Sequence, residues 1–171
     1  HAMAFSLGAA GVQGPLLDPL GGEADLDRRS VRLLHGGSPA DDPTRVFRAA
    51  RYAARLGFEL DPGFAQALDL AVASGALARI SGERLRKALD ELLAEENRAV
   101  AIGILERLGV FAGVVAGWDV DESVVRAVGS SPGTPEAWAR LLAQVPASTR
   151  LRVAERRRFS RALRRETGCL P

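Results

Sequence analysis

Helix start and stop signals recur along this chain from residue 42 onward, and they constrain its fold more than any other feature. Asp42 as N-cap, followed by Pro43, predicts a helix that runs to about Leu56 and ends at Gly57. The first 35 residues are rich in turns and predict only one or two short strands. Similar signals predict later helices that begin at Asp61, Ser81 and Asn97, and shorter ones at 122–128, 136–144 and 149–166.

Composition sets the outer limits of the interpretation. A chain of 171 residues of which 47% are apolar can bury a substantial core, which excludes wholesale disorder. The single cysteine, Cys169, forms no intramolecular disulfide, and no apolar run approaches the roughly 18 residues of a membrane span. The N-terminal residues do not have the pattern of a secretory signal. We therefore expect a cytoplasmic protein without a membrane partner.

The helix predicted at 42–56 carries four arginines and no acidic residue beyond its cap. On a helical wheel these arginines form one stripe, and the alanines, Val46 and Phe47 occupy the other side. Like charges three or four residues apart repel by a few tenths of a kcal/mol. The stripe is therefore compensated either by acids from elsewhere, for which Glu23, Asp25 and Asp27 are candidates, or by an anionic ligand. Its members are Arg45, Arg48, Arg51 and Arg55.

Asp42 and Arg45 add a more specific feature at the start of this helix. They are three residues apart on the first turn, where a carboxylate acceptor and a guanidinium donor can lie side by side. Such a pair offers one acceptor and several donors to a flat partner.

Five motifs then resemble a known family in order and spacing: HAMAFSL, LLDPLGGEADL, VRLLH, DDPTRVFRAARYAARLGFELDP and RISGERLRKALDELL. Together they are similar to the class II (bacterial-type) tRNA nucleotidyltransferase and poly(A) polymerase family. The resemblance covers roughly residues 1–95 and fades beyond Phe111. Each motif is weak alone, and five in one register argue against a chance match.

The resemblance implies a mainly α fold with a short remnant of an α/β nucleotidyltransferase head. Residues 1–37 would be the end of the head and the hinge, 38–110 a helical neck, and 111–171 the start of a helical body with a basic tail. A strand near 31–34 would complete the sheet of the head. The hinge motif corresponds to Asp18, Gly21, Gly22 and Asp25.

In the family, the matching neck helix selects the incoming nucleotide with an aspartate and an arginine that imitate a complementary base. Cytosine and adenine each present an amino donor beside a ring-nitrogen acceptor, which Asp42 and Arg45 would satisfy. Uracil and guanine would leave groups unpaired, at roughly 1 to 3 kcal/mol per group. CTP and ATP are thus the expected substrates. The supporting residues would be Arg48 and Arg51 for the triphosphate, and Asp41, Glu83 and Arg84 around the pocket.

The family binds catalytic Mg²⁺ with two carboxylates that precede the first motif found here. The aspartates at 25–27 and 119–121 imitate their spacing but have no preceding Gly-Ser turn, and we interpret them as surface or cap residues. We therefore expect no catalytic residue and no metal ligand in this chain. The head domain is the partner that the chain would need, and the chain alone is predicted to be inactive.

Residues 150–166 contain eight arginines and two glutamates. Three of them, at spacings of four and three residues, form a stripe suited to RNA phosphates, such as those at a tRNA 3′ end. An ordinary solvated helix explains the pattern equally well. The predicted RNA-binding residues are Arg157, Arg161 and Arg164.

Three functions remain open on the sequence. The first is part of a CCA-adding or A-adding tRNA nucleotidyltransferase. The second, within the same family, is a bacterial poly(A) polymerase. The third is a helical RNA-binding module without catalysis.

Overall fold

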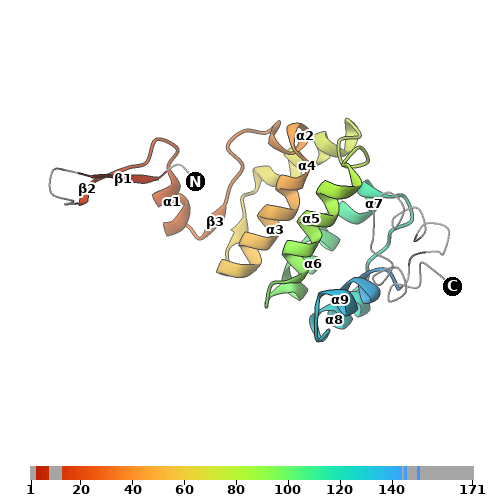
Figure 1. Ribbon diagram of the computed structural model, residues 1–171. Coiled ribbons are helices and arrows are strands. Elements are labelled where there is room, and N and C mark those ends of the chain that lie inside the picture. The colour runs from red at the N-terminus through yellow and green to blue at the C-terminus, as the bar shows by residue number, and fades with distance from the viewer. Residues whose placement is uncertain (1–2, 8–12, 144, 146–149, 151–171) are drawn as a thin grey trace.

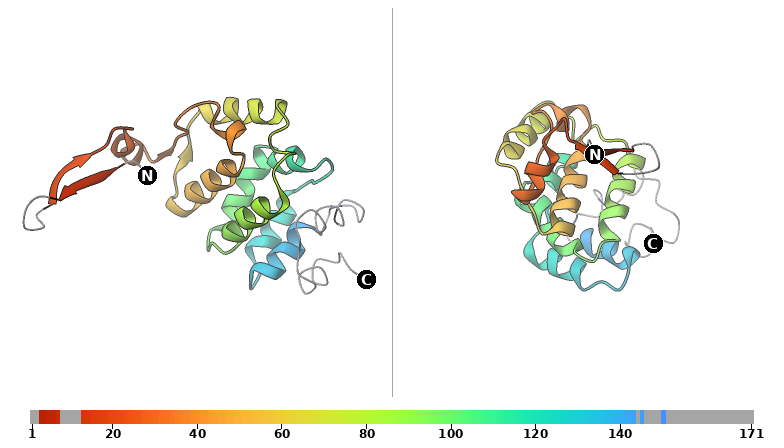
Figure 2. Two further views of the ribbon diagram at one scale, coloured as in Figure 1. Left: turned by 45° about the horizontal axis from the view of Figure 1, so that its top comes forward. Right: turned by 90° about the vertical axis from the view of Figure 1, so that its left-hand side faces the viewer.

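The computed structural model describes residues 3–7, 13–143, 145 and 150. A β-hairpin of β1 (Ala4–Leu7) and β2 (Gln13–Leu17), followed by helix α1 (Gly22–Asp27), projects from one end of a helical body (Figures 1 and 2). A two-residue strand, β3 (Ser30–Val31), leads into that body. The predicted mainly helical fold is confirmed.

The helical body contains eight helices in the described part of the chain. The prediction missed α1, α2 and α7, which are only four to six residues long and carry no strong start signal. None of the described helices combines the length and apolar character that a membrane span requires. The helices are α2 (Ser38–Asp41), α3 (Thr44–Leu56), α4 (Gly63–Ala73), α5 (Gly82–Leu93), α6 (Arg98–Arg107), α7 (Val110–Val114), α8 (Glu122–Gly129) and α9 (Thr134–Leu141).

Most helix boundaries lie close to the predicted ones. Ser81 caps α5 as predicted, since its hydroxyl accepts the Arg84 N–H. Asn97 precedes α6, but its side chain donates to the Ala54 carbonyl instead of capping the helix. The helix expected at 136–144 begins two residues earlier and ends at Leu141. Apart from residue 150, the helix expected at 149–166 lies outside the described residues.

The strand that was expected near 31–34 is β3, and among the described residues it pairs with a strand of the helical body. β3 pairs in parallel with β4 (Glu59–Leu60), with Ser30 opposite Glu59 and Val31 opposite Leu60. This pairing follows from Gly57, which ends α3 in the left-handed conformation and turns the chain back toward β3. The pairing fastens the segment after α1 to the C-terminal end of α3.

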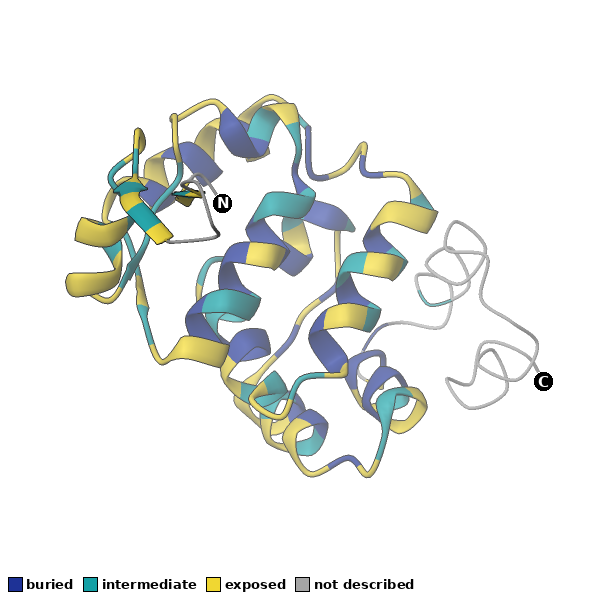
Figure 3. Ribbon diagram, turned by 60° about the vertical axis from the view of Figure 1, so that its left-hand side comes forward, coloured by how far each residue is buried: buried dark blue, intermediate teal, exposed yellow. Residues whose placement is uncertain are grey.

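A single hydrophobic core joins α3 to α9. α3 contributes its apolar face, on which Val46, Phe47 and Ala50 are at most 1% exposed. Figure 3 shows buried and exposed segments alternating along the helices of the body. The small alanines of this face allow α5 and α6 to pack closely against it. Trp118 and Trp138 fill the core near α9, and the Trp138 Nε1–H donates to Asp90 Oδ1 over 2.7 Å. The arginine-bearing face of α3 therefore points away from the core.

Candidate nucleotide-recognition site

The junction between α2 and α3 positions Asp42 and Arg45. α3 begins at Thr44, two residues later than the predicted cap, and Asp42 has an extended backbone before it. Asp42 nevertheless caps the helix, because its Oδ1 accepts the Thr44 N–H at 3.0 Å and the Thr44 hydroxyl at 2.6 Å. The missing donor of Pro43 explains why the first free N–H belongs to Thr44.

Asp42 is also tied to α5. Arg84 Nη2 donates to Asp42 Oδ1 at 2.7 Å, across 42 residues of sequence. Partial burial acts to raise the pKa of Asp42, but the Thr44 hydrogen bonds and the charges of Arg84 and Arg45 outweigh it and hold that pKa below its ordinary value. Asp42 is therefore an ionised acceptor at neutral pH. Within the described residues its hydrogen bonds all go to Oδ1, which leaves the lone pairs of Oδ2 available.

Arg45 is held by the helix that precedes it. Its Nη1 donates to Ser38 Oγ at 2.6 Å and lies 3.4 Å from the Ser38 carbonyl oxygen. Ser38 is only 4% exposed, whereas Arg45 itself is half-buried. Sequence reasoning missed Ser38, because a partner seven residues away across a helix junction leaves no periodic signal.

The arginine stripe is compensated over only half of its length. Arg51 forms ion pairs with Glu91 and Glu95, and Arg55 forms one with Glu95. The expected partners Glu23, Asp25 and Asp27 were wrong: Asp25 pairs with Arg28 and Arg32 on the hinge side. The glutamates are four residues apart, as the arginines are, and this matching spacing was the signal available in the sequence.

The other half of the stripe has no acidic partner within ion-pair distance among the described residues. Arg48 is exposed on the outer face of α3, one turn after Arg45. Hydrogen bonds from Arg48 and, to a smaller extent, from Arg51 lower the pKa of the Tyr52 phenol. Arg51 and Arg55 also lie 5.3 and 5.9 Å from the centre of the Tyr52 ring. Excess positive charge thus remains at the N-terminal half of α3.

The predicted supporting residues occupy different positions around this site. Arg84 contacts Asp42 directly, as described above. Glu83 is exposed in the first turn of α5, and Asp41 is exposed at the end of α2, where its Oδ2 lies 3.8 Å from His35 Nε2.

The hinge residues form a capped turn between the hairpin and α1. The two carboxylate oxygens of Asp18 accept the N–H groups of Gly22 and Glu23, each at 2.8 Å. Those bonds lower the pKa of Asp18. Gly21 has φ +74°, and a Cβ on Gly22 would lie 3.1 Å from the Met3 sulfur. Glycine is therefore favoured at Gly21 by its left-handed backbone, whereas a side chain at Gly22 would have to displace the Met3 side chain.

The described residues do not fit a magnesium site. No three His, Cys, Asp or Glu side chains in the described part of the chain lie close enough to hold a metal ion. Asp121 caps α8 by accepting the Val124 N–H at 2.9 Å, and Asp25 binds Arg32, so the interpretation of these aspartates as cap and surface residues is confirmed. Arg157, Arg161 and Arg164 lie outside the described residues.

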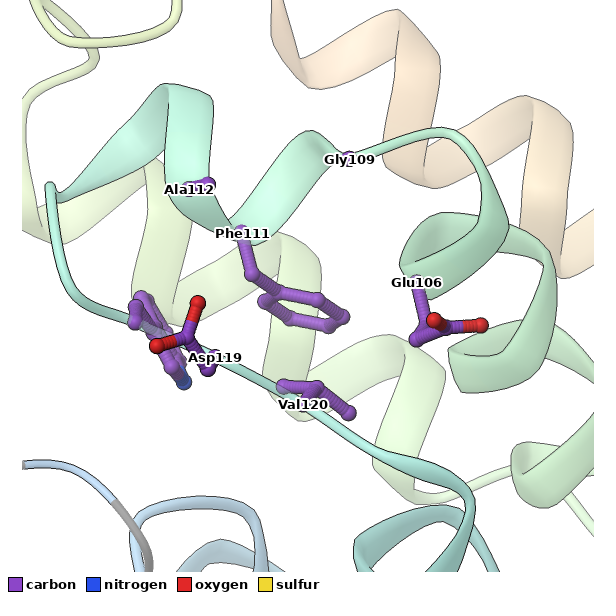
Figure 4. Close-up of a pocket in the computed structure, with 7 residues that line it drawn as sticks. Glu106, Gly109, Phe111, Ala112, Asp119 and Val120 are labelled. Atoms are coloured by element: carbon purple, nitrogen blue, oxygen red, sulfur yellow. The ribbon is translucent and has the colours of Figure 1, made fainter.

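A shallow pocket of about 160 Å³ lies elsewhere, between the end of α6, α7 and residues 118–120 (Figure 4). Phe111 lies between the carboxylates of Glu106 and Asp119 in this view. None of its lining residues belongs to α2, α3 or α5. The pocket is therefore separate from the Asp42 site.

Comparison with known proteins identifies relatives of this chain. No family model matches the chain. It is 40% identical over 98 residues to the A-adding tRNA nucleotidyltransferase of Deinococcus radiodurans. This alignment covers 56% of this chain and 23% of the relative. It is 30% identical over 156 residues to the CC-adding tRNA nucleotidyltransferase of Halalkalibacterium halodurans. That alignment covers 88% of this chain and 41% of the relative. The chain belongs to the tRNA nucleotidyltransferase family.

The fold is also similar to that of a solved structure from this family. The complex of a CCA-adding enzyme with CTP matches with a TM-score of 0.79 and 27% identity, over 97% of this chain and 43% of that one. The chain thus spans less than half the length of these nucleotidyltransferases. The family resemblance inferred from the five motifs is confirmed.

Proposed function

We propose that this chain is part of a template-independent tRNA nucleotidyltransferase that adds C, A or both to the 3′ end of tRNA. The A-adding and CC-adding names of its relatives, and the CTP bound to the CCA-adding enzyme, support this proposal. CTP and ATP would be its substrates.

The observation that carries the proposal is the pair of polar groups at the start of α3. Thr44 and Arg84 hold Asp42 through Oδ1, and Ser38 holds Arg45 through Nη1. The second carboxylate oxygen and the other guanidinium N–H groups can then accept from an amino group and donate to a ring nitrogen. Cytosine and adenine satisfy both groups, whereas uracil and guanine oppose a carbonyl to the carboxylate.

Arg48 would provide the first contact with the triphosphate. It is exposed and has no acidic partner within the described residues, so a phosphate oxygen gains a charge-assisted hydrogen bond there at little cost. Arg51 would contribute only by exchanging Glu91 or Glu95 for phosphate. Asp41, Glu83 and Arg84 would support the site from α2 and α5.

The proposal divides the chain as the motifs do, with the hinge and head remnant at 1–37, the neck at 38–110 and the body from 111. Asp18, Gly21, Gly22 and Asp25 would set the angle of the hinge. Since the described residues do not fit a magnesium site, a separate head would supply the metal, and this chain alone would select a nucleotide poorly and transfer none. Arg157, Arg161 and Arg164 would bind the RNA substrate.

Substitution of Arg45 tests this function. In the longest reading frame that contains the chain, Arg45→Ala should lower kcat/KM for CTP and ATP relative to UTP by 10-fold to 100-fold, on the order of one or two lost hydrogen bonds. Arg55→Ala, on the same helix but paired with Glu95, is the matched control and should keep the preference. Unchanged rejection of UTP in Arg45→Ala would refute the proposal.

Assays of the same protein without substitutions distinguish this function from the poly(A) polymerase and from the non-catalytic RNA-binding module. Products on tRNA that lacks its CCA end, compared with unrelated RNA, distinguish a tRNA nucleotidyltransferase from a poly(A) polymerase. RNA binding without nucleotide incorporation would favour the non-catalytic module.

A further inference from the structure

Ser38 contacts both members of the Asp42–Arg45 pair. Its hydroxyl accepts from Arg45 Nη1 at 2.6 Å, and its backbone carbonyl accepts the Asp42 N–H at 3.1 Å. The single turn of α2 thus connects the Arg45 side chain and the Asp42 backbone through one residue. Ser38 itself is fixed by the bond from its N–H to the His35 carbonyl at 3.0 Å and by Pro39, which is buried beside it.

Burial makes this contact unusual for the molecule. Only two polar residues of the described chain, Ser38 and Ser131, are buried, at 4% and 5% exposure. The Ser131 hydroxyl donates to the Ala127 carbonyl of α8, the helix that ends just before it, a local bond that holds no functional side chain. The Ser38 hydroxyl instead receives a charged donor from the next helix, and such a bond is stronger than a neutral one.

Arg45 depends on this bond for its orientation. Arginine loses more side-chain freedom on ordering than most residues do, and the usual restraint is a carboxylate. No acidic side chain of the described residues lies within ion-pair distance of Arg45. Its partner for hydrogen bonds is Ser38, through both the hydroxyl and the carbonyl.

We propose that Ser38 is a positioning residue for nucleotide selection, which holds the Arg45 guanidinium in register with the Asp42 carboxylate. This inference rests on the proposed function. Ser38 does not touch the nucleotide; it removes the freedom of the arginine that does. Because one nitrogen of the guanidinium is fixed, the remaining N–H donors point toward the base. Arg45 then cannot rotate to donate a hydrogen bond to a carbonyl of uracil.

The first experiment measures selection in the longest reading frame that contains the chain. Ser38→Ala should lower the CTP to UTP ratio of kcat/KM by about tenfold, the factor that corresponds to one hydrogen bond. Ser131→Ala, which removes the other buried hydroxyl, should keep the ratio. Ser38→Thr, which retains a hydroxyl, should have the same CTP to UTP ratio as the parent protein. Equal ratios in Ser38→Ala and Ser131→Ala would overturn the proposal.

The second experiment observes Arg45 itself, in this chain and without any nucleotide. Nitrogen-15 NMR of the guanidinium should show slow rotation and slow hydrogen exchange for Arg45 in the parent chain, and both should become at least about tenfold faster in Ser38→Ala but not in Ser131→Ala. An Arg45 signal that does not change in Ser38→Ala would overturn the proposal independently of any activity.

The two experiments also distinguish this inference from the proposed function. If Arg45→Ala abolishes selection while Ser38→Ala retains it, the positioning role fails and the function stands. If Ser38→Ala frees Arg45 and neither variant changes the CTP to UTP ratio, the proposed function fails, and the selection role of Ser38 fails with it.

Discussion

Removal of the Asp42 carboxylate should destabilise the fold by more than the loss of an ordinary helix cap. Asp42→Ala deletes the bonds to the Thr44 N–H and hydroxyl and the ion pair with Arg84. A lost cap costs about 1 kcal/mol. The Arg84 side chain is 53% exposed, so solvent screening limits the pair to roughly 0.5 kcal/mol. We expect a total loss of about 1.5 kcal/mol in the free energy of unfolding.

The chain offers a matched control for this substitution. Asp61 precedes Pro62 as Asp42 precedes Pro43, and its Oδ1 accepts the Gly63 N–H at 2.9 Å. It has neither the hydroxyl bond nor an ion pair within the described residues. Asp61→Ala should therefore cost only about 1 kcal/mol.

Urea denaturation followed by circular dichroism measures both variants, and a double-mutant cycle with Arg84→Ala isolates the ion pair. The cycle with Asp42 should give a coupling of roughly 0.5 kcal/mol, and the cycle with Asp61 should give none. Equal costs for the two aspartates, with no coupling to Arg84, would refute the view that α5 holds the Asp42 carboxylate in place.

Two further substitutions test the backbone and the hinge. Gly57→Ala should cost about 1 kcal/mol in thermal denaturation, because φ is +64° at the end of α3, whereas Gly36→Ala, whose added Cβ meets open space, should be nearly neutral. The hinge should lose stability in acid: Arg32 lowers the pKa of Asp25 in the folded chain, so the stabilisation is complete above the unfolded value of about 3.9 and is lost as the pH falls through the lower folded value. Arg32→Met should flatten this pH dependence below about pH 4, and a profile that matches the parent would exclude the pair as its cause.

The sequence by itself determined the elements whose signals are local. Ser81 begins a helix because its hydroxyl reaches an N–H only three residues away, and Gly57 ends one because glycine accepts the left-handed conformation. The apolar face of α3 followed from its periodicity, and the five motifs were sufficient to predict the family. Asp42 was recognised as a cap, but the helix starts at Thr44, one residue later than the predicted first helical residue, Pro43.

Only the tertiary structure decided which charges remain available at the site. The sequence shows four arginines in one stripe, but only the packing of α5 against α3 brings Glu91 and Glu95 to Arg51 and Arg55, forty residues away. The same packing places Arg84 on Asp42, and the turn of α2 places Ser38 on Arg45. The matching four-residue spacings of the two glutamates and the two arginines permit this pairing, but only the packing of the helices decides which residues face each other.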